Sequence, residues 1–375
     1  MPTTRSGAKG GVREVVGSKH QIDDKASPES KRPKKDEEPE DKSNEDRIPS
    51  PTEAYGSGYV PTKPKEESHA DASDTNEVQK QSKDTGGAEQ PDAREGTVPS
   101  SILEKGLVYF FFRGRVETDE PSNIEEIQRS YMILRPLGKD ASIGEGTIQD
   151  AGNTRLVAVP KKVFPRSGRD RWIAFVEKSH ASFATLKEEF LSSSEYETKT
   201  KGTRHTPAAT PAAEGVYAIT TTGRETHLAY MITLPSELGE VQKDLGLKEK
   251  GSFIISTRNP KYDAPRGTSL PKSPEYPKEV QDEFHDRRWL PSKPHHLDYV
   301  STQFLLVGES SGIEKAVEPQ KKDEEEGKDK PVEELEKLED EDTHRMEDLK
   351  GDDSEAIFAD LHARAKDYPK LPTTF

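Results

Sequence analysis

One stretch, residues 102–116 with the sequence ILEKGLVYFFFRGRV, constrains the fold of this chain more than any other. Between positions 107 and 112 both alternating sets of side chains are apolar, which is typical of a β-strand covered on both faces. Aromatic and β-branched residues are also the ones that strands favour. The stretch therefore predicts a central strand in the core of a domain.

Apolar residues are concentrated around this strand. Only 29% of the 375 residues are hydrophobic and 34% are charged, yet 20 of the 25 aromatic residues lie between positions 99 and 310. A segment with few apolar residues cannot offset the conformational entropy lost on folding. We therefore predict a disordered N-terminal tail at 1–98, one globular domain at 99–310 and an acidic, mostly disordered segment at 311–375.

The charges are distributed in the same way. Basic and acidic residues number 16 and 21 in residues 1–98, 29 and 29 in residues 99–310, and 11 and 21 in residues 311–375. A neutral domain followed by an acidic segment is not typical of a protein that holds nucleic acid over a broad face. This distribution favours protein partners.

The absence of cysteine excludes disulfide bonds and thiolate metal sites. The first ten residues, MPTTRSGAKG, lack the apolar stretch of a signal peptide, and no run approaches the roughly 20 apolar residues of a membrane helix. We therefore expect a soluble intracellular protein that does not bind membranes.

A compact basic cluster lies in the N-terminal tail. Its residues are Lys31, Arg32, Lys34 and Lys35, and acidic residues follow it. Nuclear-import receptors bind such clusters, and the alternative is a patch of solvated charge. The cluster predicts a nuclear protein, with the cytoplasm as the alternative, and the Ser-Pro pairs at 27–28 and 50–51 predict phosphorylation in the same tail.

The domain is predicted to consist mainly of strands. Thr221 to Arg224 separate two of these strands and predict a hairpin. An excess of strands with about three short helices indicates an α+β domain with a mostly antiparallel sheet or a partly open barrel. The predicted strands are 107–116, 130–134, 155–159, 172–177, 215–221, 227–233, 252–257 and 299–307.

Three helix starts are predicted in the domain. Ser182 and Ser236 are suitable N-cap residues, Gly246 would end the second helix, and Pro277 would begin the third. Long loops are expected at 135–154, 192–214 and 259–276, and loops of this length are usually functional or mobile.

The acidic segment offers two helical stretches. In the first, from 331 to 349, Asp342 interrupts the apolar stripe, so a coiled coil is not expected. In the second, Ile357, Phe358 and Leu361 share one face after a Ser354 cap. This face either docks on the chain's own domain or binds in a partner's groove, and we predict a partner-docking helix.

Three patterns in the sequence contain residues that can carry chemistry. The glycines at 138–152 are followed by a strand instead of a helix N-terminus, so a phosphate-binding loop is not expected. His295, His296 and Asp298 have metal-binding side chains, but no second cluster completes a coordination shell. Glu225 and His227 are better explained by a salt bridge at a turn than by general-base chemistry. No catalytic residue, cofactor or metal site is predicted.

A basic segment with neighbouring aromatic residues is the candidate for local nucleic-acid contact. Basic residues can follow a phosphate backbone, and aromatic residues can stack on bases. Because the domain is neutral, this positive patch must be balanced by a negative one elsewhere. Its members are Lys161, Lys162, Arg166, Arg169 and Arg171.

Several stretches of the domain resemble a known protein group. They include SSILEKGLVYFFFRGRV, KGTRHTPAATPAAEGVYAITTTGRETHLAYMITLPSELGEVQKDLGLKEKGSF, RRWLP and PHHLDY. The resemblance is to uncharacterised proteins of filamentous fungi, which are often labelled BTB domain transcription factors. This group has no activity that can be transferred to particular residues. A BTB domain is a helix-dominated dimerisation fold, whereas the pattern here is rich in strands.

These observations predict a non-enzymatic nuclear interaction protein. The domain and the acidic segment would bind protein partners, and a transcription- or chromatin-associated role is the natural setting for this arrangement. The alternatives are a nucleic-acid-binding module that uses the basic segment, or an enzyme whose pocket is assembled from distant residues.

Overall fold

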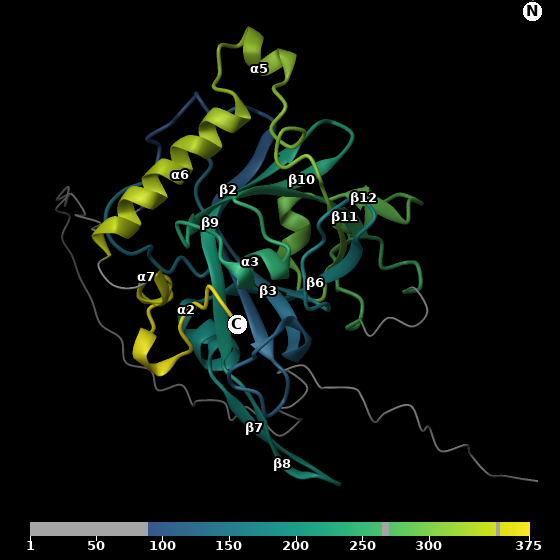
Figure 1. Ribbon diagram of the computed structural model, residues 1–375. Helices are drawn as coiled ribbons and strands as arrows, with labels where there is room; N and C mark the ends of the chain where they lie inside the picture. Colours follow the sequence, from purple (N-terminus) through teal and green to yellow (C-terminus); the bar gives the residue numbers. More distant parts are fainter. Residues whose placement is uncertain (1–88, 265–269, 350–352) are drawn as a thin grey trace, which may run out of the picture. The chain divides into compact units, whose positions relative to one another are not determined.

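Eight antiparallel strands close into a barrel in the computed structural model, which describes residues 89–264, 270–349 and 353–375 (Figure 1). The order around the barrel is β10-β9-β2-β3-β5-β6-β13-β11, and pairing of β10 with β11 closes it. The strands are β2 (Ile102–Gly114), β3 (Ile127–Pro136), β5 (Thr154–Val159), β6 (Arg171–Ala181), β9 (Ala209–Thr221), β10 (Thr226–Leu234), β11 (Lys250–Arg258) and β13 (Gln303–Gly308).

The barrel confirms the predicted α+β fold class. Each of the eight predicted strands overlaps one barrel strand, and the hairpin predicted at Thr221 to Arg224 joins β9 to β10. Strands β2-β3-β5-β6 form one meander and β9-β10-β11-β13 form a second. The two meanders meet at the β2–β9 and β6–β13 pairs, so the sheet has no open edge within the ring.

Strand β2 is covered on both faces, as its sequence predicted. Val108, Phe110 and Phe112 belong to the cluster that fills the barrel. The residues between them belong to a second cluster on the outer face of the barrel, under the C-terminal helices; they are Leu107, Tyr109 and Phe111. Side chains alternate between the two faces of β2, so this one strand contributes to both apolar clusters.

Aromatic rings fill the barrel interior. The ring of Phe110 packs edge to face on Phe164 and Tyr230, at 5.2 Å between centroids in each pair. Tyr230 in turn stacks on Phe253. Residues of α3 (Glu240–Leu245) join the same cluster. Because side chains fill the centre, a ligand site must lie at an end of the barrel or on its outside.

The shorter elements follow the local sequence signals in part. Ser182 caps α2 (Phe183–Leu186), which continues into a π-helical turn, η2 (Lys187–Leu191), and Pro277 precedes α4 (Lys278–Glu283) as predicted. The predicted cap Ser236 is wrong, because Gly239 occupies the N-cap of α3, while Gly246 ends that helix with φ of 88° as expected. Three other short elements are η1 (Ile124–Glu126), β12 (Trp289–Pro291) and η3 (Pro294–Asp298).

Two predicted loops contain strands. The 192–214 segment forms the hairpin β7 (Ser194–Thr198) and β8 (Gly202–Thr206), drawn below the barrel in Figure 1, and then enters β9. The 135–154 segment contains β4 (Ser142–Ile143), which pairs with β1 (Glu89–Gln90). None of the helices in the described ranges has the length and apolar character that crossing a bilayer would require.

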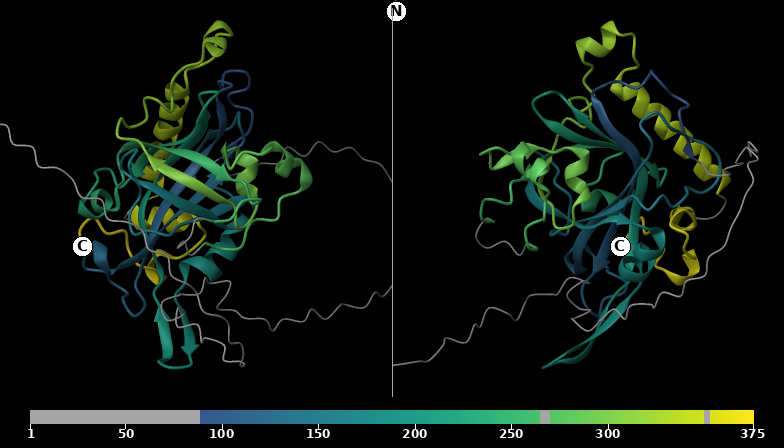
Figure 2. Two further views of the ribbon diagram at one scale, coloured as in Figure 1. Left: turned by 90° about the vertical axis from the view of Figure 1, so that its right-hand side faces the viewer. Right: turned by 180° about the vertical axis from the view of Figure 1, so that it is seen from behind.

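The C-terminal segment covers the outer face of the barrel. Its elements are α5 (Lys321–Glu325), α6 (Pro331–Asp348), α7 (Asp353–Asp360) and η4 (Ala365–Asp367). Figures 1 and 2 show α6 lying across the outside of the sheet, with α7 beside it. Leu335 and Leu338 of α6 are buried in the outer cluster. The prediction of a mostly disordered segment at 311–375 is therefore wrong for its described residues, because burial of this stripe outweighs the high charge.

A buried ionic cluster fastens α6 and α7 to the barrel. Arg345 donates hydrogen bonds to Glu214 (3.0 Å), Asp342 (2.5 Å) and Asp360 (2.6 Å). The hydroxyl of Thr233 donates to Asp342 at 2.6 Å. The side chains of Arg345 and its three carboxyl partners are fully buried. Asp342, which interrupts the apolar stripe, thus forms an ion pair with Arg345 of the same helix and accepts a hydrogen bond from Thr233 of β10 across the interface.

Stability should fall as the pH rises through the range in which this cluster titrates. Burial and the neighbouring carboxylates raise the pKa of Glu214 well above 4.5, and burial raises that of Asp342. Such a carboxyl binds a proton in the folded state that the unfolded chain has already lost above about pH 4.5. The free energy of unfolding should therefore decrease above that pH, by up to about 1.4 kcal/mol per pH unit for each proton.

Urea denaturation across a pH series measures this effect. A Glu214→Gln variant should show a flatter decrease because it has no carboxyl group to titrate at this position. Exposed Glu237 provides the matched control, and Glu237→Gln should retain the wild-type slope. Equal slopes in Glu214→Gln and the wild type would contradict this account of the cluster.

Candidate functional site

A pocket of about 690 Å³ lies at one mouth of the barrel. Its walls come from the starts of β2, β5 and β10, the end of β9 with its turn, and the segment from α4 to η3. This volume lies within the roughly 300–1,000 Å³ typical of small-molecule sites. We call it the mouth pocket.

Charged side chains form the floor of the mouth pocket. Arg155 lies two residues before Val157, and Tyr217 two residues before Ile219, and both following residues belong to the interior cluster. Strand alternation therefore directs Arg155 and Tyr217 toward the same interior. Glu104 meets both of them, because its Oε1 accepts hydrogen bonds from Arg155 Nη1 at 2.6 Å and from the Tyr217 hydroxyl at 2.7 Å.

In the floor of the mouth pocket, the positive charge of Arg155 lies between two carboxylates. Asp298 of η3 accepts a hydrogen bond from Arg155 Nε at 2.8 Å. Burial alone would lower the pKa of Arg155, but Glu104 and Asp298 raise it above its usual value, so the guanidinium stays charged. Burial and the Glu104 charge raise the pKa of Tyr217 well above 10, so its hydroxyl remains a neutral donor. The floor is thus a fixed polar layer above an apolar core.

The rim of the mouth pocket combines cations with apolar surface. Arg287 and Lys293 are exposed at the rim, and Leu290 and Pro291 of β12 lie between them in sequence and also line the pocket. Within the described residues, the guanidinium of Arg287 has no ion-pair partner. An anionic group can therefore meet an available charge at the rim while an apolar group lies against β12.

A carboxylate and two histidines meet beside the rim. Glu283 Oε1 lies 2.9 Å from Nε2 of His295, Glu283 Oε2 lies 3.3 Å from Nε2 of His296, and Lys293 Nζ lies 2.5 Å from Glu283 Oε2. Burial would raise the pKa of Glu283, but hydrogen bonds from Lys293 and His295 hold it at about 2. Burial and the His295 charge lower the pKa of His296 to about 4, so its ring is neutral at neutral pH.

The sequence pattern had shown only half of this cluster. It identified His295, His296 and Asp298 but no group to complete a metal shell. The structure brings Glu283 to the two histidines from α4 and turns Asp298 toward Arg155 instead. The eleven residues between Glu283 and His295 include β12, and nothing in their sequence indicates that they return the chain to the last carboxylate of α4.

The predicted nucleic-acid segment lies between β5 and β6, away from the mouth pocket. Lys162 forms an ion pair of 2.5 Å with Glu125, and Arg166 donates to the carbonyls of Lys243 and Asp244 at the end of α3. The charged groups of Lys162 and Arg166 are therefore already in contact with other parts of the protein. The other three members neighbour them on the same segment, where Lys161 lies 5.6 Å from the centre of the Trp172 ring; they are Lys161, Arg169 and Arg171.

The predicted partner-docking helix docks on its own barrel. Ile357, Phe358 and Leu361 are fully buried in the outer cluster. Of the two possibilities that the sequence left open, the structure has the docking of the helix on its own domain, where the outer face of the barrel covers these side chains; binding in a partner's groove stays a prediction and would require the helix to leave this face. The predicted import cluster lies outside the described residues; its members are Lys31, Arg32, Lys34 and Lys35.

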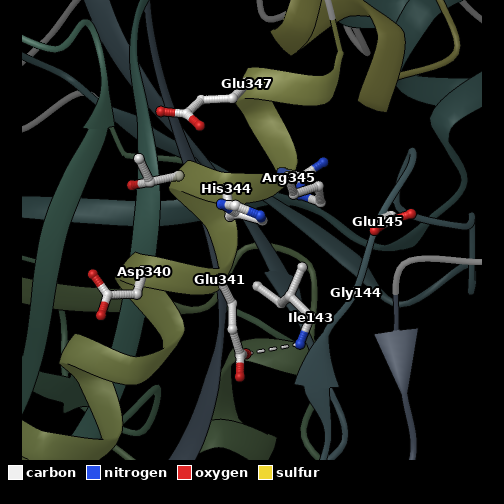
Figure 3. Close-up of a pocket in the computed structure, with 9 residues that line it drawn as sticks. Ile143, Gly144, Glu145, Asp340, Glu341, His344, Arg345 and Glu347 are labelled. Atoms are coloured by element: carbon white, nitrogen blue, oxygen red, sulfur yellow. Dashed lines mark hydrogen bonds between the residues drawn. The ribbon is translucent and has the colours of Figure 1, made fainter.

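A second pocket of about 500 Å³ separates α6 from the loop after β4 (Figure 3). Carboxylates dominate its lining, which includes Glu145, Asp340 and Glu347 around His344. Glu341 Oε2 accepts a hydrogen bond from the Ile143 backbone at 2.9 Å, drawn as a dashed line in Figure 3. This bond holds α6 against β4, so we assign the pocket to attachment of the C-terminal segment.

The other histidines with carboxylate partners lie elsewhere. His227 is buried on the outer face of β10, with Nδ1 2.8 Å from Glu309. Nε2 of His205, on the β7–β8 hairpin, lies 2.7 Å from Asp119 of the segment between β2 and η1. Neither lines the mouth pocket, whereas His295 does.

No family model, curated protein or solved structure was found to match the chain. The functional assignment must therefore come from the geometry of the sites themselves. Among these sites, the mouth pocket combines volume, apolar surface, a fixed polar floor and an available cation.

Proposed function

We propose that this protein binds a small amphiphilic organic anion in the mouth pocket, without catalysing a reaction on it. The observation that carries the proposal is the arrangement of charge. In the floor, the single cation Arg155 is paired with two carboxylates, Glu104 and Asp298, whereas Arg287 at the rim has no ion-pair partner within the described residues. A ligand's anionic group is expected at the rim, and its apolar part against Leu290.

The floor supports binding more than catalysis. Glu104 Oε1 accepts two hydrogen bonds, and the Tyr217 hydroxyl donates one of them, while burial and the Glu104 charge raise the pKa of Tyr217 well above 10, so this hydroxyl is not poised to give up a proton at neutral pH. A fixed polar layer of this kind orients a ligand by offering the remaining carboxylate and guanidinium positions as hydrogen-bond partners.

Charge reversal at the rim tests the proposal, with 8-anilinonaphthalene-1-sulfonate as the probe because it combines a sulfonate with apolar rings. Arg287→Glu should weaken binding of this probe, followed by its fluorescence, by at least about tenfold through lost attraction and new repulsion. The matched control is Arg288→Glu, since Arg288 lies over the Tyr262 ring and does not line the pocket. Equal weakening in both variants, or none in Arg287→Glu, would refute the proposed site.

We also propose that the protein works in the nucleus with protein partners, as its sequence predicts. Val300 is the single large hydrophobic side chain that is mostly exposed on the described surface, so no group of such side chains marks a contact site there. Polar surfaces and the N-terminal tail are then the expected contact regions.

A fluorescent fusion of the full chain tests the nuclear proposal. Changing Lys31, Arg32, Lys34 and Lys35 to alanine should shift the protein from the nucleus to the cytoplasm, because import receptors read the cluster's positive charge. Changing Lys63 and Lys65, two isolated lysines of the same tail, should leave its location unchanged. Unaltered nuclear accumulation in the cluster variant would contradict the prediction.

A further inference from the structure

Three metal-binding side chains converge beside the mouth pocket. Glu283 is the last residue of α4, and His295 and His296 lie on η3. One ligand atom from each lies within 4.8 Å of the other two. We propose that these three side chains bind a divalent transition-metal ion, with zinc as the expected one.

The distances suit a tetrahedral ion. Two ligand atoms that each lie about 2.0–2.1 Å from zinc at tetrahedral angles are roughly 3.3 Å apart. The separation between Glu283 Oε2 and His296 Nε2 is 3.3 Å, and that between Glu283 Oε1 and His295 Nε2 is 2.9 Å. The two distances involve different oxygens of the Glu283 carboxylate, and one ligand atom from each of the three residues lies within 4.8 Å of the other two, so an ion held by all three requires adjustment of the Glu283 and His295 side chains. Two imidazoles and one carboxylate are also a donor set that zinc accepts.

His296, the most buried of the three proposed metal-binding residues, is held in place by its neighbours. The ring of His296 is fully buried and stacks on Phe284 with 5.4 Å between centroids. Its Nδ1 lies 3.2 Å from the Thr257 hydroxyl oxygen, which in turn lies 2.8 Å from that of Ser292. A zinc-bound histidine normally donates its other N–H to such an acceptor, and Thr257 can play this part.

The metal-free protein holds a different proton arrangement. The backbone N–H of Lys293 donates to Nδ1 of His296 at 3.2 Å, so the proton of the neutral ring lies on Nε2, facing Glu283. Binding through Nε2 moves that proton to Nδ1, where Thr257 can accept it. No net proton is released from His296 by this change of tautomer, but one hydrogen bond from the Lys293 backbone is lost.

Lys293 also competes with the ion through its side chain. Its ammonium lies 2.5 Å from Glu283 Oε2, and the side chain is 49% exposed, so it can turn toward solvent. An ion that displaces it would release a cation to the rim of the mouth pocket. The fourth coordination position could then be filled by the anionic group of the proposed ligand, and this last step alone rests on the proposed function.

Cobalt(II) absorption tests the site without any organic ligand, because tetrahedral cobalt absorbs strongly in the visible range. The experiment uses the untagged full chain at neutral pH, with zinc added afterwards as competitor. We expect one cobalt ion per chain, displaced by zinc. His295→Ala should weaken this binding by at least tenfold, and His295 is 45% exposed, so the variant should fold. His205→Ala, on the β7–β8 hairpin, is the matched control and should bind as the wild type does.

Two further variants separate the site from general binding to acidic residues. Lys293→Ala should tighten cobalt binding several-fold because it removes the competing ammonium, and Thr257→Val should weaken it about tenfold. Binding that is equal in the wild type, His295→Ala and Lys293→Ala, or a spectrum typical of octahedral cobalt, would overturn the proposal. Because the probe is the metal alone, failure here would leave the sulfonate-binding test of the mouth pocket unaffected.

Discussion

Replacing Arg345 with methionine should lower the free energy of unfolding by about 3–5 kcal/mol, which is the cost of removing one partner from a buried ionic cluster. Methionine fills a similar volume but provides no N–H groups. Glu214, Asp342 and Asp360 would then face one another in a fully buried site without a cation. Urea denaturation monitored by circular dichroism would measure the change.

The same helix offers a matched control for this substitution. Lys337 of α6 forms an ion pair of 2.6 Å with Asp329, and its side chain is 48% exposed. Exposed pairs contribute at most about 1 kcal/mol, so Lys337→Met should have a small effect. Similar losses in the two variants would show that α6 is not anchored through Arg345.

Replacing Phe358 with alanine should lower the free energy of unfolding by about 3–5 kcal/mol, as expected for a large cavity in a core. Phe358 is fully buried in the outer cluster and stacks on Tyr368 with 5.1 Å between ring centroids. Thermal denaturation of the isolated protein would measure the effect. This experiment separates a helix docked on its own barrel from one reserved for a partner.

An unchanged melting temperature in Phe358→Ala would contradict this expectation. A helix that is reserved for a partner contributes little to the stability of the free protein, so this result would favour the partner-docking prediction. Val300→Ala is the control, because this apolar side chain is 51% exposed and its loss should cost little.

The strands could be predicted because their signals are local. Each barrel strand carries enough aromatic and β-branched residues to be recognised alone, and the turn after Thr221 shows how two of them connect. Closure of the barrel could not be predicted from the sequence, because it depends on the pairing of β10 with β11 and on a core shared by all eight strands. Such pairing is a property of distant segments, which composition does not reveal.

The role of the C-terminal segment was missed because its charge suggested disorder. Residues such as Asp342 and Glu334 look solvated in sequence, but Asp342 meets Arg345, and Glu334 meets Lys105 of β2 at 2.6 Å. A buried charge becomes acceptable only when its partner is present, and Lys105 lies 229 residues away. A prediction based on local composition therefore assigned the segment to the wrong class.

The mouth pocket was missed for a related reason. Glu104, Arg155 and Tyr217 belong to three different strands, and each alone resembles an ordinary strand residue. Strand alternation turns these side chains toward the barrel interior, but only the order and pairing of the strands show that they meet at the same mouth. The signal available in sequence was a charged residue at an inward position near a strand end, which is common enough to carry little weight alone.

A crystal structure of the full chain with bound 8-anilinonaphthalene-1-sulfonate would test the central claim most directly. The account predicts density for the probe in the mouth pocket, with the sulfonate at Arg287 and the rings against Leu290 and Pro291. Density in the pocket between α6 and the loop after β4, or on the outer face of the barrel after displacement of α7, would contradict it.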